Sequence, residues 1–473
     1  MTTASPSVQS ALETMTKADR QLRKRNARAR RWSAIYLGAC IFALIGLILL
    51  FGTVLNNMFG VVVKTYAVPP SQLSPNQALE NLSEAELGAI LSDYFSKQNR
   101  GIQRARVLVR DNLLGKNIDP ARLSGEPISS LFAGRDYPPE VAELKFSELT
   151  VPQLIQLLES SISQSQLYQM VVKDVLQPRI PQSWTLLEGI FNWNRIETEA
   201  QAKYPGEAIM WHSWFSWAFV SSELTSDPST TGLRMAIVGT VYILILTVLI
   251  SIPLGIGAAI YLEEYAKHSR FTALLETVIR NLAGVPSIIY GMLGLALFVR
   301  ALGDDAGITN GRVFGITDTN GRTILSASLT MSLLILPVII INSQEAIRAV
   351  PASLREASYG IGATRWQTVW RTVLPAGLPG ILTGVILSLA RAVGETAPLL
   401  VVGGLTFLTV DPNSIFSKFS VIPIQIFSWT SEPNPQFKNV AAAAIITLLG
   451  ILLTLNAAAI ILRQRYSKKL RGA

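Results

Sequence analysis

Long apolar runs alternate with polar segments along this chain, and each run has about the 20 residues that an α-helix needs to cross a bilayer. Six such runs occur, at 32–55, 234–262, 281–300, 323–342, 376–404 and 439–462. For the first run a cleavable signal peptide is the alternative, but the run exceeds the usual apolar core and lacks an obvious small-x-small exit. The pattern predicts an all-α, polytopic membrane protein with six transmembrane helices.

The longest polar segment, 64–231, is predicted to form a small, mainly helical insert between the first and second transmembrane helices. Apolar residues recur at helical spacing in 83–97 and in 150–176. Ser83 is followed three positions later by a glutamate, which is a capping-box pattern, and Thr150 is a candidate cap for the second helix. The aromatic run 211–219 fits either a membrane interface or a core patch of the insert.

The distribution of charge orients the predicted helices. The chain is 49% hydrophobic and only 15% charged, a low charged fraction for a soluble protein. Its formal net charge of +9 has the sign expected for nucleic-acid binding, but the basic residues crowd into two tails, at 17–31 and 463–472. Basic flanks beside apolar spans are typical of the cytoplasmic side, so we expect a bacterial inner (plasma) membrane protein with both termini in the cytoplasm.

This topology divides the chain into segments with an expected side. Loops 263–280 and 343–375 face the cytoplasm, whereas 64–231, 301–322 and 405–438 face outward. The expected domains are a basic tail (1–31), a first-helix segment (32–63), an extracytoplasmic insert (64–231), a core of five helices (232–465) and a second basic tail (466–473).

Few residues of this chain suggest metal or redox chemistry. Cys40 is the single cysteine and lies in the first apolar run, and His212 and His268 lie far apart and in no metal-binding motif. Four spans contain proline, at Pro253, Pro286, Pro337 and Pro398. One proline is most simply a packing kink, but the set together favours a transporter whose pathway is lined by bent helices.

The loop 343–375 is predicted to form two short helices joined by a tight turn. Pro351 should end the extension of the fourth span, Ser353 can cap a new helix, and Gly360 and Gly362 permit the turn. A second amphipathic piece, 364–374, precedes Pro375. Its exposed aromatic residues and basic rim suit either docking to a partner protein or a hairpin lying on anionic lipid.

The stretch "EASYGIGATRWQTVWRTVLP" (356–375) resembles the EAA loop of ATP-binding-cassette (ABC) importer permeases. In that family a Glu-Ala-Ala sequence and a following glycine form a coupling helix that inserts into a groove of the ATPase. The residues that match are Glu356, Ala357, Gly362, Leu374 and Pro375, whereas Ser358 and Thr372 depart mildly from the pattern. The resemblance implies that Glu356, Ala357 and Gly362 couple this chain to an ATPase.

Residues 234–465, roughly half of the chain, further resemble the PstA family of phosphate-importer permeases. The resemblance rests on "AIVGTVYILILTVLISIPLGIGAAIYLEEYA", "NLAGVPSIIYGMLGLALFV", "VPASLREASYGIGATRW" and "LPGILTGVILSLARAVGETAPLL". It implies four kinds of partner: a sister permease (PstC-like), an ATPase dimer (PstB-like), an extracytoplasmic phosphate-binding protein (PstS-like) and membrane lipid. The insert is longer than this family's outward loop, and Ile341 stands where the family often has arginine.

The fifth span carries only two charges, which lie on one predicted helical stripe with small residues. The stripe consists of Gly380, Gly384, Ser388, Arg391 and Glu395. Small residues allow a neighbouring helix to approach, and a charge at mid-membrane costs at least ~2.5–3.5 kcal/mol. Either Arg391 and Glu395 neutralise each other and fix helix packing, or they line an anion pathway. We also expect Pro398 to leave the carbonyl of Gly394 without a helical donor.

Once the resemblance is counted, the anion pathway is the better hypothesis. The planar donors of guanidinium match two oxygens of phosphate at once. Phosphate near neutral pH keeps a proton that Glu395 can accept in a hydrogen bond, and sulfate has none. Thr396 is a candidate for an additional hydroxyl contact.

The leading interpretation is a permease subunit of an ATP-driven phosphate importer. The chain carries no G-x-x-x-x-G-K-[ST] loop, so we expect it to be no enzyme itself and to need no cofactor, with ATP and Mg bound by the partner ATPase. The alternatives are a permease for sulfate, molybdate, an amino acid or another small solute, and a scaffold or sensor role. An intramembrane enzyme is disfavoured because no Ser/His pair, paired membrane aspartates or H-E-x-x-H occurs.

Overall fold

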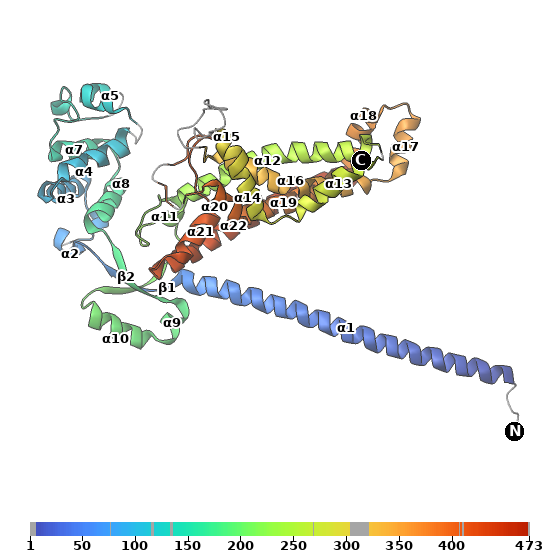
Figure 1. The fold of residues 1–473 in the computed structure, drawn as a ribbon. Coiled ribbons are helices and arrows are strands. Elements are labelled where there is room, and N and C mark those ends of the chain that lie inside the picture. Colours follow the sequence, from blue (N-terminus) through green and yellow to red (C-terminus); the bar gives the residue numbers. More distant parts are fainter. Residues whose placement is uncertain are drawn as a thin grey trace. The chain divides into compact units, whose positions relative to one another are not determined.

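The computed structural model describes residues 6–75, 77–114, 118–132, 136–267, 269–302, 321–405, 407–408 and 411–471, with only the backbone described at 6–25, 27–28, 120 and 466–471. His268 and most of the predicted outward loop 301–322 lie outside the described residues. The chain divides into two compact units: a membrane unit of residues 1–59 and 213–473, and an insert of Gly60–His212 (Figure 1).

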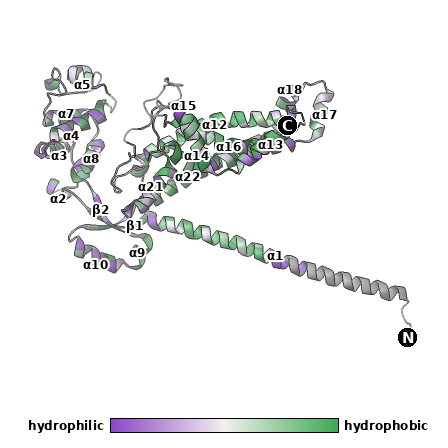
Figure 2. Cartoon of the chain, viewed as in Figure 1, coloured by the Kyte–Doolittle hydropathy of each residue, from purple (hydrophilic) through white to green (hydrophobic). Residues whose placement is uncertain are grey.

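Within the described residues of the membrane unit, five helical segments are long and apolar enough to cross a bilayer, and hydrophobic residues run along them in Figure 2. Three of them lie within single helices: Ala29–Met58 in α1 (Pro6–Met58), Ile324–Arg348 as α16, and Gln436–Arg465 in α22 (Gln436–Arg471). The segment Arg234–Tyr265 consists of α12 (Arg234–Ile260) and η5 (Tyr261–Tyr265). The segment Arg365–Gly394 consists of α18 (Arg365–Thr368), η7 (Val369–Val373) and α19 (Leu374–Gly394). The end of α22 lies toward the same end of this unit as α18 (Figure 1). The predicted all-α membrane fold is therefore confirmed.

The predicted third span is not one straight helix. α13 (Arg270–Ala283) and the segment Ser287–Leu302 meet at an angle of 104°. The second segment comprises α14 (Ser287–Gly294), η6 (Leu295–Val299) and α15 (Arg300–Leu302). Pro286 is the N-cap residue of α14, with φ −56° and ψ 136°, so the backbone is extended at that point. The boundary of the predicted helix at 281 is wrong because proline starts a new helix there and cannot continue the old one.

The predicted fifth span, 376–404, is displaced at both ends. Its helix begins at Arg365 and runs through Pro375, because the π-helical turn Val369–Val373 rearranges the backbone hydrogen bonds just before this proline. The helix ends at Gly394, Glu395 is extended, and a separate α20 (Ala397–Val402) follows. The expected second piece, 364–374, is therefore continuous with the fifth span.

Three helices of the membrane unit pack closely through small and polar residues. A Cβ added to Gly255 of α12 would lie 2.5 Å from Ile339 Cγ2 of α16. Thr247 Oγ1 donates to the Ser328 carbonyl at 3.4 Å between the same two helices. On the other side of α16, Gly384 of α19 lies directly against Asn342. Short side chains let helix backbones approach in a bilayer, which is why α12, α16 and α19 form the centre of this unit.

The insert is mainly helical and carries a three-stranded sheet that the sequence did not predict. Its strands are β1 (Phe59–Thr65), β2 (Arg179–Thr185) and β3 (Ala208–Ser213), in the order β2-β1-β3, with β1 and β2 antiparallel. The helical elements are α2 (Pro70–Leu73), η1 (Leu79–Asn81), α3 (Glu84–Lys97), α4 (Gly101–Val109), η2 (Arg110–Leu114), α5 (Pro120–Gly125), α6 (Ile128–Leu131), η3 (Pro139–Val141), α7 (Val151–Ser161), α8 (Gln164–Met170), η4 (Val171–Leu176), α9 (Leu186–Phe191) and α10 (Trp193–Lys203).

Helix caps in the insert follow the sequence signals closely. Ser83 and Glu86 form the expected capping box of α3, and Thr150 forms one with Gln153 at α7. The apolar pattern over 150–176 is not one helix, because Ser163 caps a new one after Ile162. A local capping side chain satisfies orphan amides and so fixes a helix start from neighbouring residues alone.

The expected insert boundary at 231 differs from the compact unit, which ends at His212. Residues 213–233, including α11 (Trp217–Ser221), belong with the membrane unit, where Leu233 N donates to the Phe219 carbonyl at 2.8 Å. The aromatic run 211–219 therefore crosses the boundary between the two units. Trp214 and Phe219 are buried, whereas Trp211, Phe215 and Trp217 are exposed. α17 (Ala352–Gly360) and α21 (Ile422–Ser431) complete the described helices of the membrane unit.

Candidate functional site

Arg391 and Glu395 lie where α19 ends. Arg391 is in the last turn of the helix and Glu395 is its C-cap residue. Arg391 Nε donates to Glu395 Oε1 at 3.3 Å, so the two charges pair at the predicted i,i+4 spacing. The Arg391 side chain is 42% exposed and that of Glu395 20%. The pair therefore leaves much of the guanidinium accessible to a further ligand or to a second protein.

A second interrupted helix packs beside the segment that follows this pair. A Cβ on Gly291 of α14 would lie 2.7 Å from Pro398 Cα of α20. Tyr290 Oη donates to the Leu282 carbonyl at 2.7 Å, across the bend between α13 and α14. Two broken membrane helices thus meet close to a charged pair, an arrangement that transporters use for substrate sites near mid-membrane.

The structure differs from the expectation at Pro398. The sequence predicted a helix that continues past Gly394, whose carbonyl would lack a hydrogen-bond donor because proline has no amide hydrogen. The helix already ends at Gly394, and Pro398 lies in the first turn of α20, where helical amides have no partner in any case. Thr396 is the N-cap residue of α20, and its side chain makes no capping hydrogen bond.

The small residues of the predicted stripe face α16. Gly384 and Ser388 are buried, Ser388 Oγ donates to the Gly384 carbonyl at 2.9 Å, and a Cβ on Gly380 would lie 2.7 Å from Ala346 Cβ. Arg391, one turn further, is exposed. The stripe therefore changes its surroundings along α19, from a helix contact to an open surface.

The loop 343–375 forms the expected pair of short helices. α17 (Ala352–Gly360) starts after Pro351, which is itself the N-cap residue, so the prediction of Ser353 as cap is wrong. Gly362 has φ +84°, a conformation that glycine adopts without strain, and Thr364 caps α18. Ser358 and Thr368 hydrogen-bond at 2.9 Å and hold the two helices together.

The three predicted coupling residues, Glu356, Ala357 and Gly362, are all exposed. Beside them, Trp366 and Trp370 stack with ring centroids 5.3 Å apart and planes 12° apart, and both rings are more than half exposed. Exposed, rigid aromatic side chains suit a protein interface. The loop thus presents a preformed docking surface.

Sequence reasoning missed how this loop is fixed to the spans. Arg355 of α17 donates through Nε and Nη2 to Glu264 Oε1 of η5, at 3.1 and 2.8 Å. Its Nη1 donates to the Val350 carbonyl at 2.6 Å and its Nη2 to the Ile347 carbonyl at 2.9 Å, at the end of α16. The glutamate pair of "YLEEY" was the available signal, but nothing in the sequence pairs it with a residue 91 positions away.

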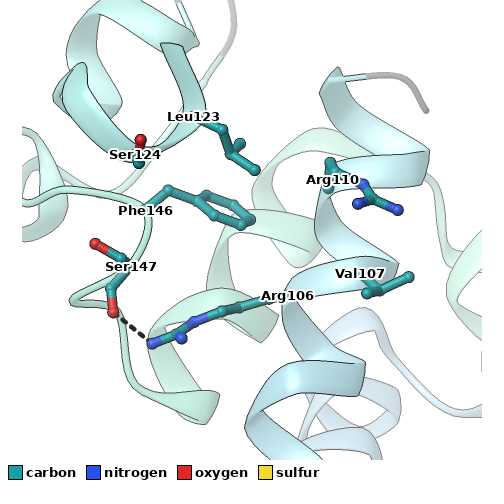
Figure 3. A pocket seen from close by; sticks show the side chains of 7 residues that line it. All are labelled: Arg106, Val107, Arg110, Leu123, Ser124, Phe146 and Ser147. Carbon is teal, nitrogen blue, oxygen red and sulfur yellow. Dashed lines mark hydrogen bonds between the residues drawn. The ribbon is translucent and has the colours of Figure 1, made fainter. Parts of the chain in front are cut away.

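The insert contains a cavity of about 200 Å³ lined by Arg106, Val107, Arg110, Leu123, Ser124, Phe146 and Ser147 (Figure 3). Arg106 Nη2 donates to the Ser147 carbonyl at 2.5 Å, and the Arg110 guanidinium pairs with Asp111 at 2.7 Å. Each guanidinium thus has a protein partner, while the buried Nε of Arg106 has none. Among the described residues, no group of three or more His, Cys, Asp or Glu side chains could hold a metal ion.

Comparison with known proteins finds one matching family and several relatives. The model of the family "Binding-protein-dependent transport system inner membrane component" matches residues 251–472. The Bacillus subtilis "Probable ABC transporter permease protein YqgI" is 32% identical over 54% of this chain and 86% of its own length. "Phosphate transport system permease protein PstA 1" of Mycobacterium tuberculosis is 30% identical over 54% of this chain and 80% of its own. "Phosphate transport system permease protein PstA" of Yersinia pestis is 30% identical over 52% and 77%.

Proposed function

Because this chain belongs to the family of binding-protein-dependent transport system inner membrane components, and so is the membrane permease subunit of an ABC transporter, we propose that the solute it carries is inorganic phosphate. The relatives named as phosphate permeases support this choice, and YqgI, at similar identity, is named only as an ABC transporter permease.

The observation that carries the proposal is the charged pair Arg391–Glu395 at the break between α19 and α20. A guanidinium presents planar donors that fit two phosphate oxygens, and Glu395 holds the group in position through one hydrogen bond. The carboxylate of Glu395 can also accept a hydrogen bond from the hydroxyl that phosphate keeps near neutral pH. Thr396, the next residue, offers a hydroxyl to the same space. Sulfate has no proton to donate, so this pair would favour phosphate over it.

The proposal extends to the assembly. The α17–α18 hairpin lies on the cytoplasmic side with both chain termini, and Glu356, Ala357 and Gly362 contact the ATPase. ATP hydrolysis by a PstB-like dimer moves this hairpin, and the permease pair, this chain with a PstC-like sister, opens alternately to each side. A PstS-like protein delivers phosphate from outside. Members of this family have no ATPase site of their own, so the assembled complex is the phosphate-transporting ATPase.

Uptake of labelled phosphate into vesicles that hold the assembled complex tests the proposal. We expect ATP-dependent uptake by the wild-type complex and a loss of at least tenfold in the Arg391→Gln variant, with sulfate taken up poorly by both. A wild-type complex that hydrolyses ATP but moves no phosphate would refute the choice of solute. Unchanged uptake by the variant would remove Arg391 from the pathway and leave it as a packing residue.

A further inference from the structure

Exposed apolar side chains of the insert gather at one place. Leu187, Ile190 and Phe191 of α9 and Trp211 of β3 are each more than half exposed; we refer to these four residues as the α9 face. Met210 beside them is also exposed. Elsewhere on the described residues of the insert, only Ile102 and Val107 among the large apolar side chains are comparably open to solvent. A cluster of this kind marks a surface that contacts something apolar.

The α9 face is one continuous surface. A Cβ added to Gly189 of α9 would lie 2.7 Å from the ring of Trp211 and 2.6 Å from Val61 Cγ2, so the helix packs directly on β3 and β1. Trp211 in turn stacks on Trp193, with ring centroids 5.8 Å apart and planes 19° apart. The absence of a side chain at Gly189 is what brings the exposed residues of α9 and the tryptophan into one patch.

The chain fixes this face near the end of a membrane span. α1 ends at Met58, β1 starts at the next residue, and Val61 is only three residues beyond Met58. A strand rises about 3.3 Å per residue, so α9 packs on a residue within about 10 Å of the end of the span. The polar layer of a bilayer is several ångströms deep, and interfacial helices bury their apolar face about 5–10 Å into it.

The charge of the α9 face suits such a layer. α9 carries a single charged residue, Glu188. Its carboxylate accepts hydrogen bonds from Thr185 N at 2.9 Å and Thr185 Oγ1 at 3.0 Å, which caps the helix start. The remaining residues of α9 are apolar or glycine, and tryptophan, which has an apolar body and one polar N–H, is enriched where membrane meets water.

We propose that the α9 face lies in the membrane–water interface at which α1 ends. Leu187, Ile190 and Phe191 contact the upper acyl chains of the lipids, and Trp211 lies at the level of the headgroups. The insert is thereby held on the bilayer at its sheet, while its helical part, residues 79–176, stays in water. This role adds to the proposed transport function and does not depend on which solute is carried.

Spin labels test the proposal in the assembled complex, because Cys40 is the single cysteine and a Cys40→Ser background leaves one label site per variant. Labels are placed at Phe191→Cys, where the native side chain is 77% exposed, and at Leu187→Cys. The matched control is Val107→Cys, an apolar residue of α4 that is 46% exposed. Each complex is placed in nanodiscs of phosphatidylethanolamine and phosphatidylglycerol, and collision rates with oxygen and with a water-soluble nickel chelate are compared.

Oxygen concentrates in lipid and the chelate in water. We expect the ratio of oxygen to chelate collision rates to be at least threefold higher at positions 187 and 191 than at position 107. Equal ratios at all three positions would place the face in water and overturn the proposal. Labels at 187 and 191 that are shielded from both reagents would also overturn it, because the face would then be covered by protein. Testing two positions guards against a local disturbance by one label.

Discussion

Arg355 and Glu264 form an ion pair that joins the α17–α18 hairpin to the end of a membrane span. Glu264 is 8% exposed, and the guanidinium of Arg355 also donates to two carbonyls at the end of α16. The Ile347 carbonyl lies in the last turn of α16, where carbonyls have no i+4 amide within the helix, and the Val350 carbonyl lies just beyond the helix end. One side chain thus links α17 both to η5, which continues α12, and to the end of α16. A displacement of the α17–α18 hairpin would therefore be passed to both spans.

Removing this link should separate ATP hydrolysis from transport. In Arg355→Met, Glu264 keeps its buried carboxylate without a partner, which costs roughly 3–5 kcal/mol when a buried pair is broken. We expect the α17 contact to loosen and the number of solute molecules moved per ATP to fall at least fivefold, while the ATPase stays bound. Arg355→Lys should give a transport ratio between those of wild type and Arg355→Met, because one ammonium cannot reproduce the planar set of donors of a guanidinium. The measurement is simultaneous uptake and ATP hydrolysis in vesicles.

The pair Arg348–Glu263 provides the matched control for that experiment. It starts from the same turn, η5, but joins it to the end of α16 and not to α17, with 2.5 Å between Arg348 Nη2 and Glu263 Oε1. The arginine side chain is 56% exposed, and a pair whose cation is open to solvent contributes about 0–1 kcal/mol. Arg348→Met should therefore leave the transport ratio within about twofold of wild type. If both methionine variants move the same number of solute molecules per ATP, Arg355 is not needed to pass movement of the α17–α18 hairpin to the spans.

Glu395→Gln tests the proton-accepting role proposed for the pathway. Glutamine has nearly the same shape but offers an NH₂ group where the carboxylate had an acceptor, and it removes the charge that holds Arg391. We expect phosphate uptake to fall at least tenfold and the preference for phosphate over sulfate to shrink. Competition of unlabelled sulfate against labelled phosphate measures this preference. Full uptake with undiminished preference would show that Glu395 plays no part in selection.

Gly384→Ala should destabilise the membrane unit. A methyl group there would overlap the Cβ of Asn342 on α16, and a buried clash between packed helices costs about 1–3 kcal/mol. Gly257→Ala on α12 is the control, because a Cβ at Gly257 meets nothing within 4 Å. That change should be neutral or stabilising by up to about 1 kcal/mol, since alanine favours helix over glycine. Thermal unfolding in detergent should therefore move in opposite directions for the two variants.

The contribution of Asp174 to the stability of the insert should fall as pH rises. Burial raises the pKa of Asp174, which the nearby charges of Lys173 and Arg104 oppose, and its Oδ2 has no hydrogen-bond partner. The folded state therefore keeps this proton when the unfolded state has lost it. Stability is full below the unfolded pKa, about 4, and declines as pH rises toward the raised folded value.

Asp174→Asn removes this titration without removing the side chain. We expect the variant to gain roughly 1 kcal/mol over wild type at pH 8, the lower end of the cost of an unpartnered buried polar group, and nothing at pH 3. Hydrogen exchange of the amides in Val171–Leu176, corrected for intrinsic rates, measures the difference. The pKa of Glu159 is also raised, by burial and by Glu84. Because Glu159 is present in both proteins, its contribution cancels from the difference in stability between wild type and variant. A difference independent of pH would contradict the account.

The sequence by itself determined the features that depend on neighbouring residues. Runs of apolar residues give the spans because a helix satisfies its own backbone in lipid, and Ser83 and Thr150 start helices because each caps amides within three residues. The turn at Gly362 and the i,i+4 contact of Arg391 with Glu395 are equally local, which is why both could be predicted.

Only the tertiary structure decided which distant segments meet. Pro375 lies within a helix whereas Pro286 starts one, and a propensity for breaking helices cannot distinguish them, because a π-helical turn before Pro375 rearranges the backbone. The pairing of Arg355 with Glu264 joins residues far apart in the chain. β1 also needs β2, more than a hundred residues away, before it is a strand at all. Such contacts depend on how helices and strands pack, which the order of residues along the chain does not display.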